Sequence, residues 1–236
     1  MADTTCSRRD MLRTAVLGAG VGLAGATLVD FASPPVLDAQ TSLSPADALQ
    51  ELIAGNQRCV ANQLTSIQQD LEVLRSHTAD KQEPFAAVLA CADSRVPVEL
   101  IFDQTIGRLF VARVAGNLVT PEIIASLEYA VAVLGVKAIL VLGHSNCGAV
   151  KAAIKAEPVP GQISALYPPL RLAVEHSHGD VVRAIEINAD VQAELLRTSS
   201  TVIRDGVKAG KVSVASGVYD LSTGKVSFAE KYLKGQ

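Results

Sequence analysis

Two continuous apolar runs, residues 85–90 and 138–142, constrain the fold of this chain more than any other feature. Each run has the length of a β-strand, and because it does not alternate with polar residues, both faces of the strand must be buried. Apolar side chains recur at helical spacing between the runs, as in residues 120–134. Buried strands that alternate with helices predict a single-domain α/β fold, with a central, mostly parallel β-sheet flanked by helices.

The rest of the chain adds helices and strands to this plan. Ser44 before Pro45 is typical of a helix start, because serine caps the first turn and proline is favoured just inside it. Further helices are expected over residues 65–74, 180–199 and 201–208, and further strands over 109–112, 212–214 with 218–219, and 226–228. The last of these strands follows a turn and is expected at an antiparallel edge of the sheet, near the C-terminus.

The first 39 residues look like a targeting segment. Arg8 and Arg9 precede an uncharged stretch, residues 14–29, that glycines interrupt. This pattern resembles a bacterial twin-arginine export signal, which implies a periplasmic or otherwise exported protein that meets the export machinery only through the signal. We therefore expect residues 1–39 to be the signal, without a clear cleavage site, and residues 40–236 to form the folded domain. The alternatives are an uncleaved signal that anchors the protein in a membrane and a disordered basic tail.

Charge and composition narrow the choice of partner. The formal net charge is -3, aromatic residues make up 4%, and there is no tryptophan. Nucleic-acid binding needs a basic face, often with an aromatic stacking platform, so no nucleic-acid partner is expected. Of the four cysteines, Cys6 lies in the predicted signal. The odd number left in the domain favours a metal site over a complete set of disulfides.

Metal-binding residue types follow the two apolar runs directly. The first run leads into Cys91, Asp93 and Arg95, and the second leads into His144 and Cys147. Ligands bind at the carboxyl ends of strands in open α/β sheets, and two thiolates with one imidazole suit tetrahedral Zn²⁺. The alternatives are ordinary packing of each residue, or a disulfide between the two cysteines, which would leave the other three residues without a role.

The order Cys-x-Asp-x-Arg and then His-x-x-Cys resembles the signature of the β-class carbonic anhydrases, and the likeness extends over about residues 44–232. Further family-like segments are Gly55-Asn56-Gln57-Arg58, Gln82-x-Pro84, Arg113-x-Ala115-Gly116-Asn117, Glu128-Tyr129-Ala130-Val131 and Gly217-Val218-Tyr219-Asp220. The resemblance implies an enzyme, a carbonic anhydrase, that catalyses the zinc-dependent, reversible hydration of carbon dioxide to bicarbonate and a proton.

The resemblance also implies the roles of the residues at the metal. Cys91, His144 and Cys147 match the three zinc ligands, with one Zn²⁺ in each subunit. Asp93 and Arg95 match a catalytic dyad. In the mechanism that this implies, Asp93 orients a zinc-bound hydroxide for attack on CO₂. If its pairing with Arg95 breaks, Asp93 becomes a fourth ligand and closes the site.

Pocket residues and assembly are implied in the same way. Gln82, Phe110 and Tyr129 match positions that line the substrate pocket in the plant-type branch of the family, where the pocket forms between subunits. A homodimer or higher homo-oligomer is therefore expected. Cys59 stands outside the motifs and is interpreted as a packing residue of the core.

Other functions remain open from the residues alone. A related zinc hydrolase of carbonyl sulfide or carbon disulfide would need the same residue types. A non-catalytic zinc-binding protein would need four permanent ligands and would leave Asp93 and Arg95 without a purpose. A nucleotide-binding module would need a glycine-rich phosphate loop after the first strand, which this chain lacks.

Overall fold

The computed structural model describes residues 41–69 and 71–229, so the predicted export signal lies outside the described residues. The strands are β1 (Ala86–Ala90), β2 (Leu109–Arg113), β3 (Ala138–His144), β4 (Ser213–Tyr219) and β5 (Val226–Phe228). The helices are α2 (Pro45–Val60), α3 (Leu71–Thr78), α4 (Val98–Ile101), α5 (Pro121–Ala132), α6 (Gly148–Lys155), α7 (Tyr167–Ser177), α8 (Val181–Ser199) and α9 (Thr201–Lys208). Short 3-10 turns are η1 (Ser66–Gln68), η2 (Ala115–Asn117) and η3 (Ile163–Leu166).

The strands form one sheet in the order β2-β1-β3-β4-β5. β1 pairs in parallel with β2 and with β3, β3 pairs in parallel with β4, and β5 runs antiparallel to β4. The register places Val88 of β1 between Val111 of β2 and Leu140 of β3. The predicted α/β fold, with a mostly parallel sheet and an antiparallel edge strand near the C-terminus, is confirmed.

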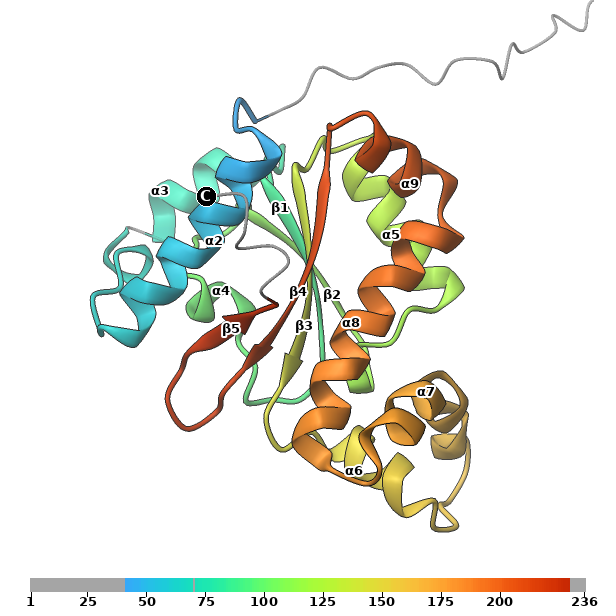
Figure 1. Ribbon diagram of the computed structural model, residues 1–236. Coiled ribbons are helices and arrows are strands. Elements are labelled where there is room, and N and C mark those ends of the chain that lie inside the picture. Colours follow the sequence, from blue (N-terminus) through green and yellow to red (C-terminus); the bar gives the residue numbers. More distant parts are fainter. Residues whose placement is uncertain (1–40, 70, 230–236) are drawn as a thin grey trace, which may run out of the picture. The chain divides into compact units, whose positions relative to one another are not determined.

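Helices cover both faces of this sheet (Figure 1). On one face, Val88 and Leu140 pack among buried residues of α2 and α4, such as Leu52. On the other face, Leu89 and Val141 pack with buried residues of α5, α8 and α9. Alternate residues of β1 and β3 thus point into two layers that are both apolar, which is why these strands read in the sequence as uninterrupted apolar runs.

A third apolar cluster lies beyond the carboxyl ends of β1 and β3, where α6 and α7 pack against α8 (Figure 1). The cluster includes Cys91, Cys147 and the fully buried Leu170. α6 begins directly after Cys147, which stands at the N-cap position of that helix. The packing of α6 and α7 therefore shields both cysteines from water.

The helix expected over residues 65–74 is wrong in its extent. The structure has η1, then the extended residue Gln69, and only later α3. At the start of η1, the carboxylate of Asp103 accepts hydrogen bonds from the backbone N–H groups of Thr65 and Ser66, at 2.9 and 2.8 Å. Asp103 is distant in sequence, so the local pattern could not predict this contact. The sequence pattern also does not predict α7.

The same carboxylate gives a pH-dependent prediction for stability. The Asp103 side chain has no exposed surface, and it also accepts hydrogen bonds from Arg58 Nε at 2.6 Å and from the Thr65 hydroxyl at 2.8 Å. Burial alone would raise the pKa of Asp103, but Arg58 and the donors of Thr65 and Ser66 outweigh it and hold that pKa well below its usual range. A depressed pKa in the folded state stabilises the protein above the unfolded pKa of about 4, and this contribution disappears as the pH falls through the folded value.

We therefore expect Asp103→Asn to lower the free energy of unfolding at pH 7 by about 3 kcal/mol, since it leaves Arg58 facing a neutral partner. The difference from the unchanged protein should shrink below about pH 4. Urea unfolding at several pH values measures both quantities, with the exposed Asp205→Asn as the control. A difference that stays constant down to pH 2 would show that the charge of Asp103 is not what stabilises this contact.

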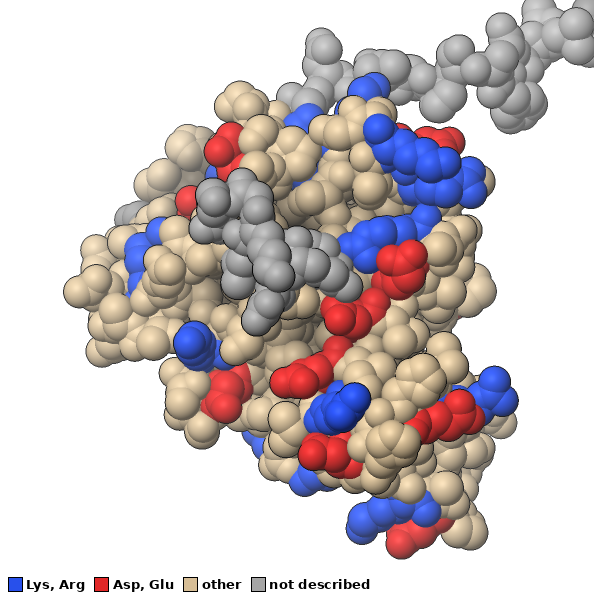
Figure 2. Space-filling view, in the orientation of Figure 1, with Lys and Arg blue, Asp and Glu red and all other residues tan. Residues whose placement is uncertain are grey.

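None of the helices in residues 41–69 and 71–229 is both long and apolar enough to cross a membrane. Figure 2 shows one face of the molecule, on which several basic side chains gather at the upper right and acidic side chains lie beside and below them.

Candidate metal centre

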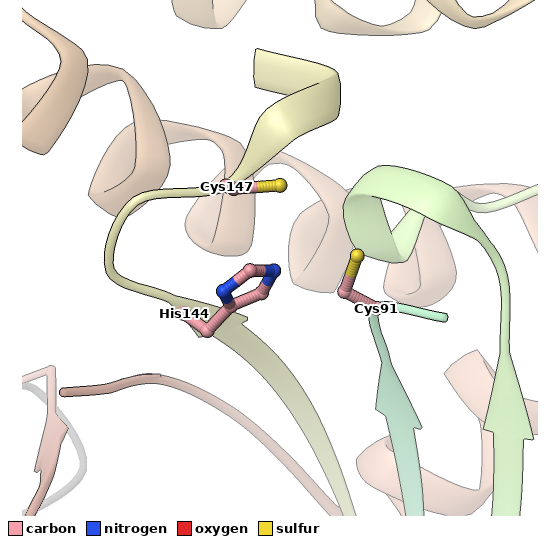
Figure 3. Close-up of side chains that lie close together, drawn as sticks. All are labelled: Cys91, His144 and Cys147. Carbon is pink, nitrogen blue, oxygen red and sulfur yellow. The ribbon is translucent and has the colours of Figure 1, made fainter. Parts of the chain in front are cut away.

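Cys91, His144 and Cys147 meet at the carboxyl edge of the sheet, as the sequence predicts (Figure 3). Cys91 directly follows β1, His144 is the last residue of β3, and Cys147 precedes α6. Because β1 and β3 are parallel neighbours, their ends bring together residues that lie far apart in the sequence. The two sulfur atoms and a ring nitrogen of His144 all lie within 4.8 Å of one another. We call these three residues the Cys-His-Cys cluster.

One hydrogen bond orients the imidazole of His144 and selects its tautomer. Its Nδ1 lies 2.9 Å from the carbonyl oxygen of Ser145. A carbonyl oxygen only accepts hydrogen bonds, so Nδ1 carries a proton, and in that tautomer of the neutral ring Nε2 presents a lone pair. Nε2 is buried and has no hydrogen-bond partner. An unpartnered buried acceptor is costly, and a metal cation is the kind of group that would satisfy it.

The two cysteines of the cluster are free thiols, so the alternative of a disulfide between them is not what the structure contains. A hydrogen bond from the Cys147 thiol lowers the pKa of Cys91 to about 4, with further help from His144 and from the backbone N–H of Gly116. The same contact, together with burial, raises the pKa of Cys147. The first thiol of the pair therefore ionises readily, and the second would ionise on binding a divalent cation. Two thiolates and a neutral imidazole carry two negative charges, and this donor set fits Zn²⁺.

Asp93 stands beside the cluster and is held by Arg95. The guanidinium of Arg95 donates from Nε to Oδ1 at 2.9 Å and from Nη2 to Oδ2 at 2.7 Å, and the Arg95 backbone N–H donates to Oδ1 at 2.9 Å. These bonds hold the pKa of Asp93 well below its usual range, so the carboxylate is ionised. Oδ2 lies 3.9 Å from Nε2 of His144, which places one carboxylate oxygen near the three candidate ligand atoms.

Arg113 holds the loop that carries Cys91 and Asp93, a role that the sequence analysis missed. Its Nε donates to the Cys91 carbonyl oxygen at 3.0 Å, and its Nη2 donates to the Asp93 carbonyl oxygen at 2.5 Å. Gly116 adds a backbone N–H bond to the Cys91 sulfur at 3.3 Å. Both residues belong to the family-like segment 113–117, which is the sequence feature that could have drawn attention to them.

Gln82, Phe110 and Tyr129 lie together, but not at the Cys-His-Cys cluster of their own chain. The rings of Phe110 and Tyr129 have centroids 6.3 Å apart, and Gln82 and Tyr129 line one shallow hollow. Gln82 precedes β1, whereas Cys91 follows it, and the five residues of β1 span about 17 Å. Tyr129 is 45% exposed, and β2, which carries Phe110, is an edge strand of the described sheet. These residues therefore form a separate surface at the other end of β1.

Comparison with known proteins agrees with this geometry. A family model described as carbonic anhydrase matches residues 86–226, a range that contains the whole Cys-His-Cys cluster. A carbonic anhydrase of Mycolicibacterium smegmatis is 37% identical over 193 residues, which cover 78% of this chain and 92% of that protein. Carbonic anhydrase 2 of Mycobacterium tuberculosis is 33% identical over 190 residues, which cover 77% of this chain and 91% of that protein. The crystal structure of a β-carbonic anhydrase from Aspergillus fumigatus matches with a TM-score of 0.63 and 26% identity, over 79% of this chain and 95% of that one.

Proposed function

Because this chain belongs to the β-class carbonic anhydrase family, we propose that it catalyses the reversible hydration of carbon dioxide to bicarbonate and a proton. The observation that carries the proposal is the Cys-His-Cys cluster with the ionised Asp93 beside it. Cys91, His144 and Cys147 would hold one Zn²⁺ in each subunit. A zinc ion bound there would supply Lewis acidity, which makes water nucleophilic at neutral pH.

Three ligands rather than four support a catalytic role over a structural one. Structural zinc sites are closed by four permanent protein ligands, whereas catalytic sites keep one position open. The fourth potential ligand near the cluster is Asp93, and the bidentate bond from Arg95 holds it in place. A non-catalytic protein would have no need for this ion pair.

Asp93, Arg95 and His144 would have different roles in the reaction. Arg95 keeps Asp93 ionised and oriented, and Asp93 Oδ2 accepts a hydrogen bond from the attacking water and so aims its lone pair at CO₂. The hydrogen bond between Nδ1 of His144 and the Ser145 carbonyl fixes the orientation of the ring, so that Nε2 faces the cluster. Without the bonds from Arg95, Asp93 would be free to serve as a fourth ligand of a bound zinc, because its Oδ2 already lies 3.9 Å from His144 Nε2.

The position of Gln82, Phe110 and Tyr129 supports a homo-oligomer of at least two subunits. Within one chain they lie at the far end of β1 from the cluster, so the plant-type pocket would take these three residues from a second copy. The exposure of Tyr129 and the position of β2 at the edge of the described sheet are consistent with such an interface. Export through the predicted signal, residues 1–39, remains part of the proposal and rests on Arg8 and Arg9.

Stopped-flow hydration of CO₂ by purified protein of known zinc content tests the function. We expect turnover in proportion to bound zinc, with about one zinc per chain, and a sedimentation mass of a dimer or larger. Carbonyl sulfide and carbon disulfide, assayed side by side, give the comparison substrates. Zinc-loaded protein that leaves CO₂ hydration at the uncatalysed rate would refute the proposal, and faster turnover of a sulfur analogue would change the substrate.

A further inference from the structure

Two buried carboxamides, Asn188 and Gln192, lie behind the Cys-His-Cys cluster on α8. Each is only 1% exposed, and they stand one helical turn apart on a stripe whose other buried members are apolar. Burying an amide costs free energy unless its donors and acceptors find partners. Both amides have partners, and each amide makes one bond to the backbone of the loop that contacts the Cys91 sulfur; Gln192 Nε2 also donates to the Pro169 carbonyl of α7 at 3.3 Å.

The first amide reaches this sulfur through one residue. Asn188 Nδ2 donates to the carbonyl oxygen of Gly116 at 2.9 Å, and the backbone N–H of Gly116 donates to the Cys91 sulfur at 3.3 Å. Gly116 has a φ of 76°, a left-handed conformation that favours glycine. The bond from Asn188 therefore fixes the peptide on one side of Gly116, while the N–H on its other side meets the sulfur.

The second amide fixes the first and holds the end of the same loop. Gln192 Nε2 donates to Asn188 Oδ1 at 3.1 Å, and Gln192 Oε1 accepts from the backbone N–H of Val119 at 2.8 Å. The loop from Gly116 to Val119 is thus attached to α8 at both ends. A chain of hydrogen bonds runs from Gln192 through Asn188 and Gly116 to the sulfur of Cys91.

We propose that Asn188 and Gln192 are positioning residues of the metal centre, which hold the Gly116 N–H against the sulfur of a zinc-binding Cys91. This inference rests on the proposed function, because it takes Cys91 as a zinc ligand. Hydrogen bonds to a ligating sulfur orient it and withdraw charge from it, and loss of such outer partners weakens metal binding by 10- to 100-fold in other sites. The side-chain bonds of both amides go to the backbone of Gly116, Val119 and Pro169 and to each other, so their effect on the metal centre passes through the Gly116 N–H and Cys91.

A matched pair of variants tests the proposal. Asn188→Ala removes the bond to Gly116. Asn56→Ala is the control, because Asn56 is a buried asparagine of α2, on the opposite face of the sheet. Its side chain forms hydrogen bonds with the backbone of Ile101, Gly224 and Val226. Both variants should lower the thermal midpoint. Only Asn188→Ala should speed the loss of zinc to excess chelator, by about tenfold, and shift the sulfur-to-metal absorption band of the cobalt-substituted protein.

The outcomes separate the two proposals. If both variants lose zinc at the same rate and keep the cobalt bands of the unchanged protein, the positioning role is overturned. The proposed function is unaffected by that result, provided that the unchanged protein binds zinc and hydrates CO₂. Failure of the unchanged protein to bind zinc or to hydrate CO₂ would overturn the proposed function itself. If Asn188→Ala does not fold, Gln192→Met tests the positioning role instead, because methionine keeps the side-chain volume. Gln192→Met should also speed the loss of zinc and shift the cobalt absorption band.

Discussion

Replacing Asp93 by asparagine should lower kcat/KM for CO₂ hydration by about 10²- to 10³-fold without loss of zinc. Asparagine has nearly the same shape and still offers one oxygen to Arg95, so the loop between β1 and α4 should keep its conformation. Its second group is an amide N–H₂, which cannot accept the hydrogen bond that Oδ2 accepts from Arg95 Nη2. It also cannot accept a proton from water, so the orientation of the nucleophile is lost.

Stopped-flow kinetics with metal analysis on the same samples measures this effect. Asp205→Asn provides a control, because Asp205 is an exposed carboxylate on α9 whose ion pair with Arg204 lies away from the cluster. Turnover that stays at the level of the unchanged protein in Asp93→Asn would remove Asp93 from the mechanism. Loss of zinc along with turnover would instead make Asp93 a ligand in the active state.

Cys147→Ser should abolish both zinc binding and CO₂ hydration. A serine hydroxyl is not ionised at neutral pH and is a much weaker zinc ligand than a thiolate. Cys147 stands at the N-cap of α6, a position where serine is favoured, so the substitution should not disrupt the helix. Zinc at a thousandfold excess over its Kd adds about 4 kcal/mol to the free energy of unfolding, and the variant should lose this increment.

The third cysteine of the described domain gives the matched control. Cys59 is half-buried in α2, outside the Cys-His-Cys cluster, and burial raises the pKa of its thiol. Cys59→Ser should therefore keep its zinc, its turnover and its zinc-dependent stability. Metal content, CO₂ hydration and urea unfolding with and without added zinc distinguish the two variants. A Cys147→Ser protein that still holds one zinc and turns over would exclude Cys147 as a ligand.

The residue types and their places at strand ends were enough to predict the Cys-His-Cys cluster, because strand polarity alone brings Cys91 and His144 to one edge. The same reasoning predicted the parallel sheet from two apolar runs. What it could not provide are contacts set by tertiary packing. Asp103 binds the start of η1 from a position far away in sequence, and Asn188 and Gln192 look like ordinary polar positions of a helix until the fold buries them.

The pocket residues show a different limit. The resemblance predicts Gln82, Phe110 and Tyr129 as pocket residues. Within one chain, these three residues lie away from the Cys-His-Cys cluster. A pocket that combines these residues with a metal centre requires a second subunit. Its geometry therefore depends on the assembly and not on the fold of one chain.

The origin of the cluster on two adjacent strands has a consequence for folding. His144 and Cys147 are close in sequence, but Cys91 joins them only when β1 pairs with β3 in the correct alignment. A slip of one residue would move Cys91 by about 3.3 Å and turn its side chain to the opposite face of the sheet. Tight zinc binding would then be lost. Because zinc would bind the correctly aligned chain more tightly than a misaligned one, it would stabilise the native strand alignment selectively.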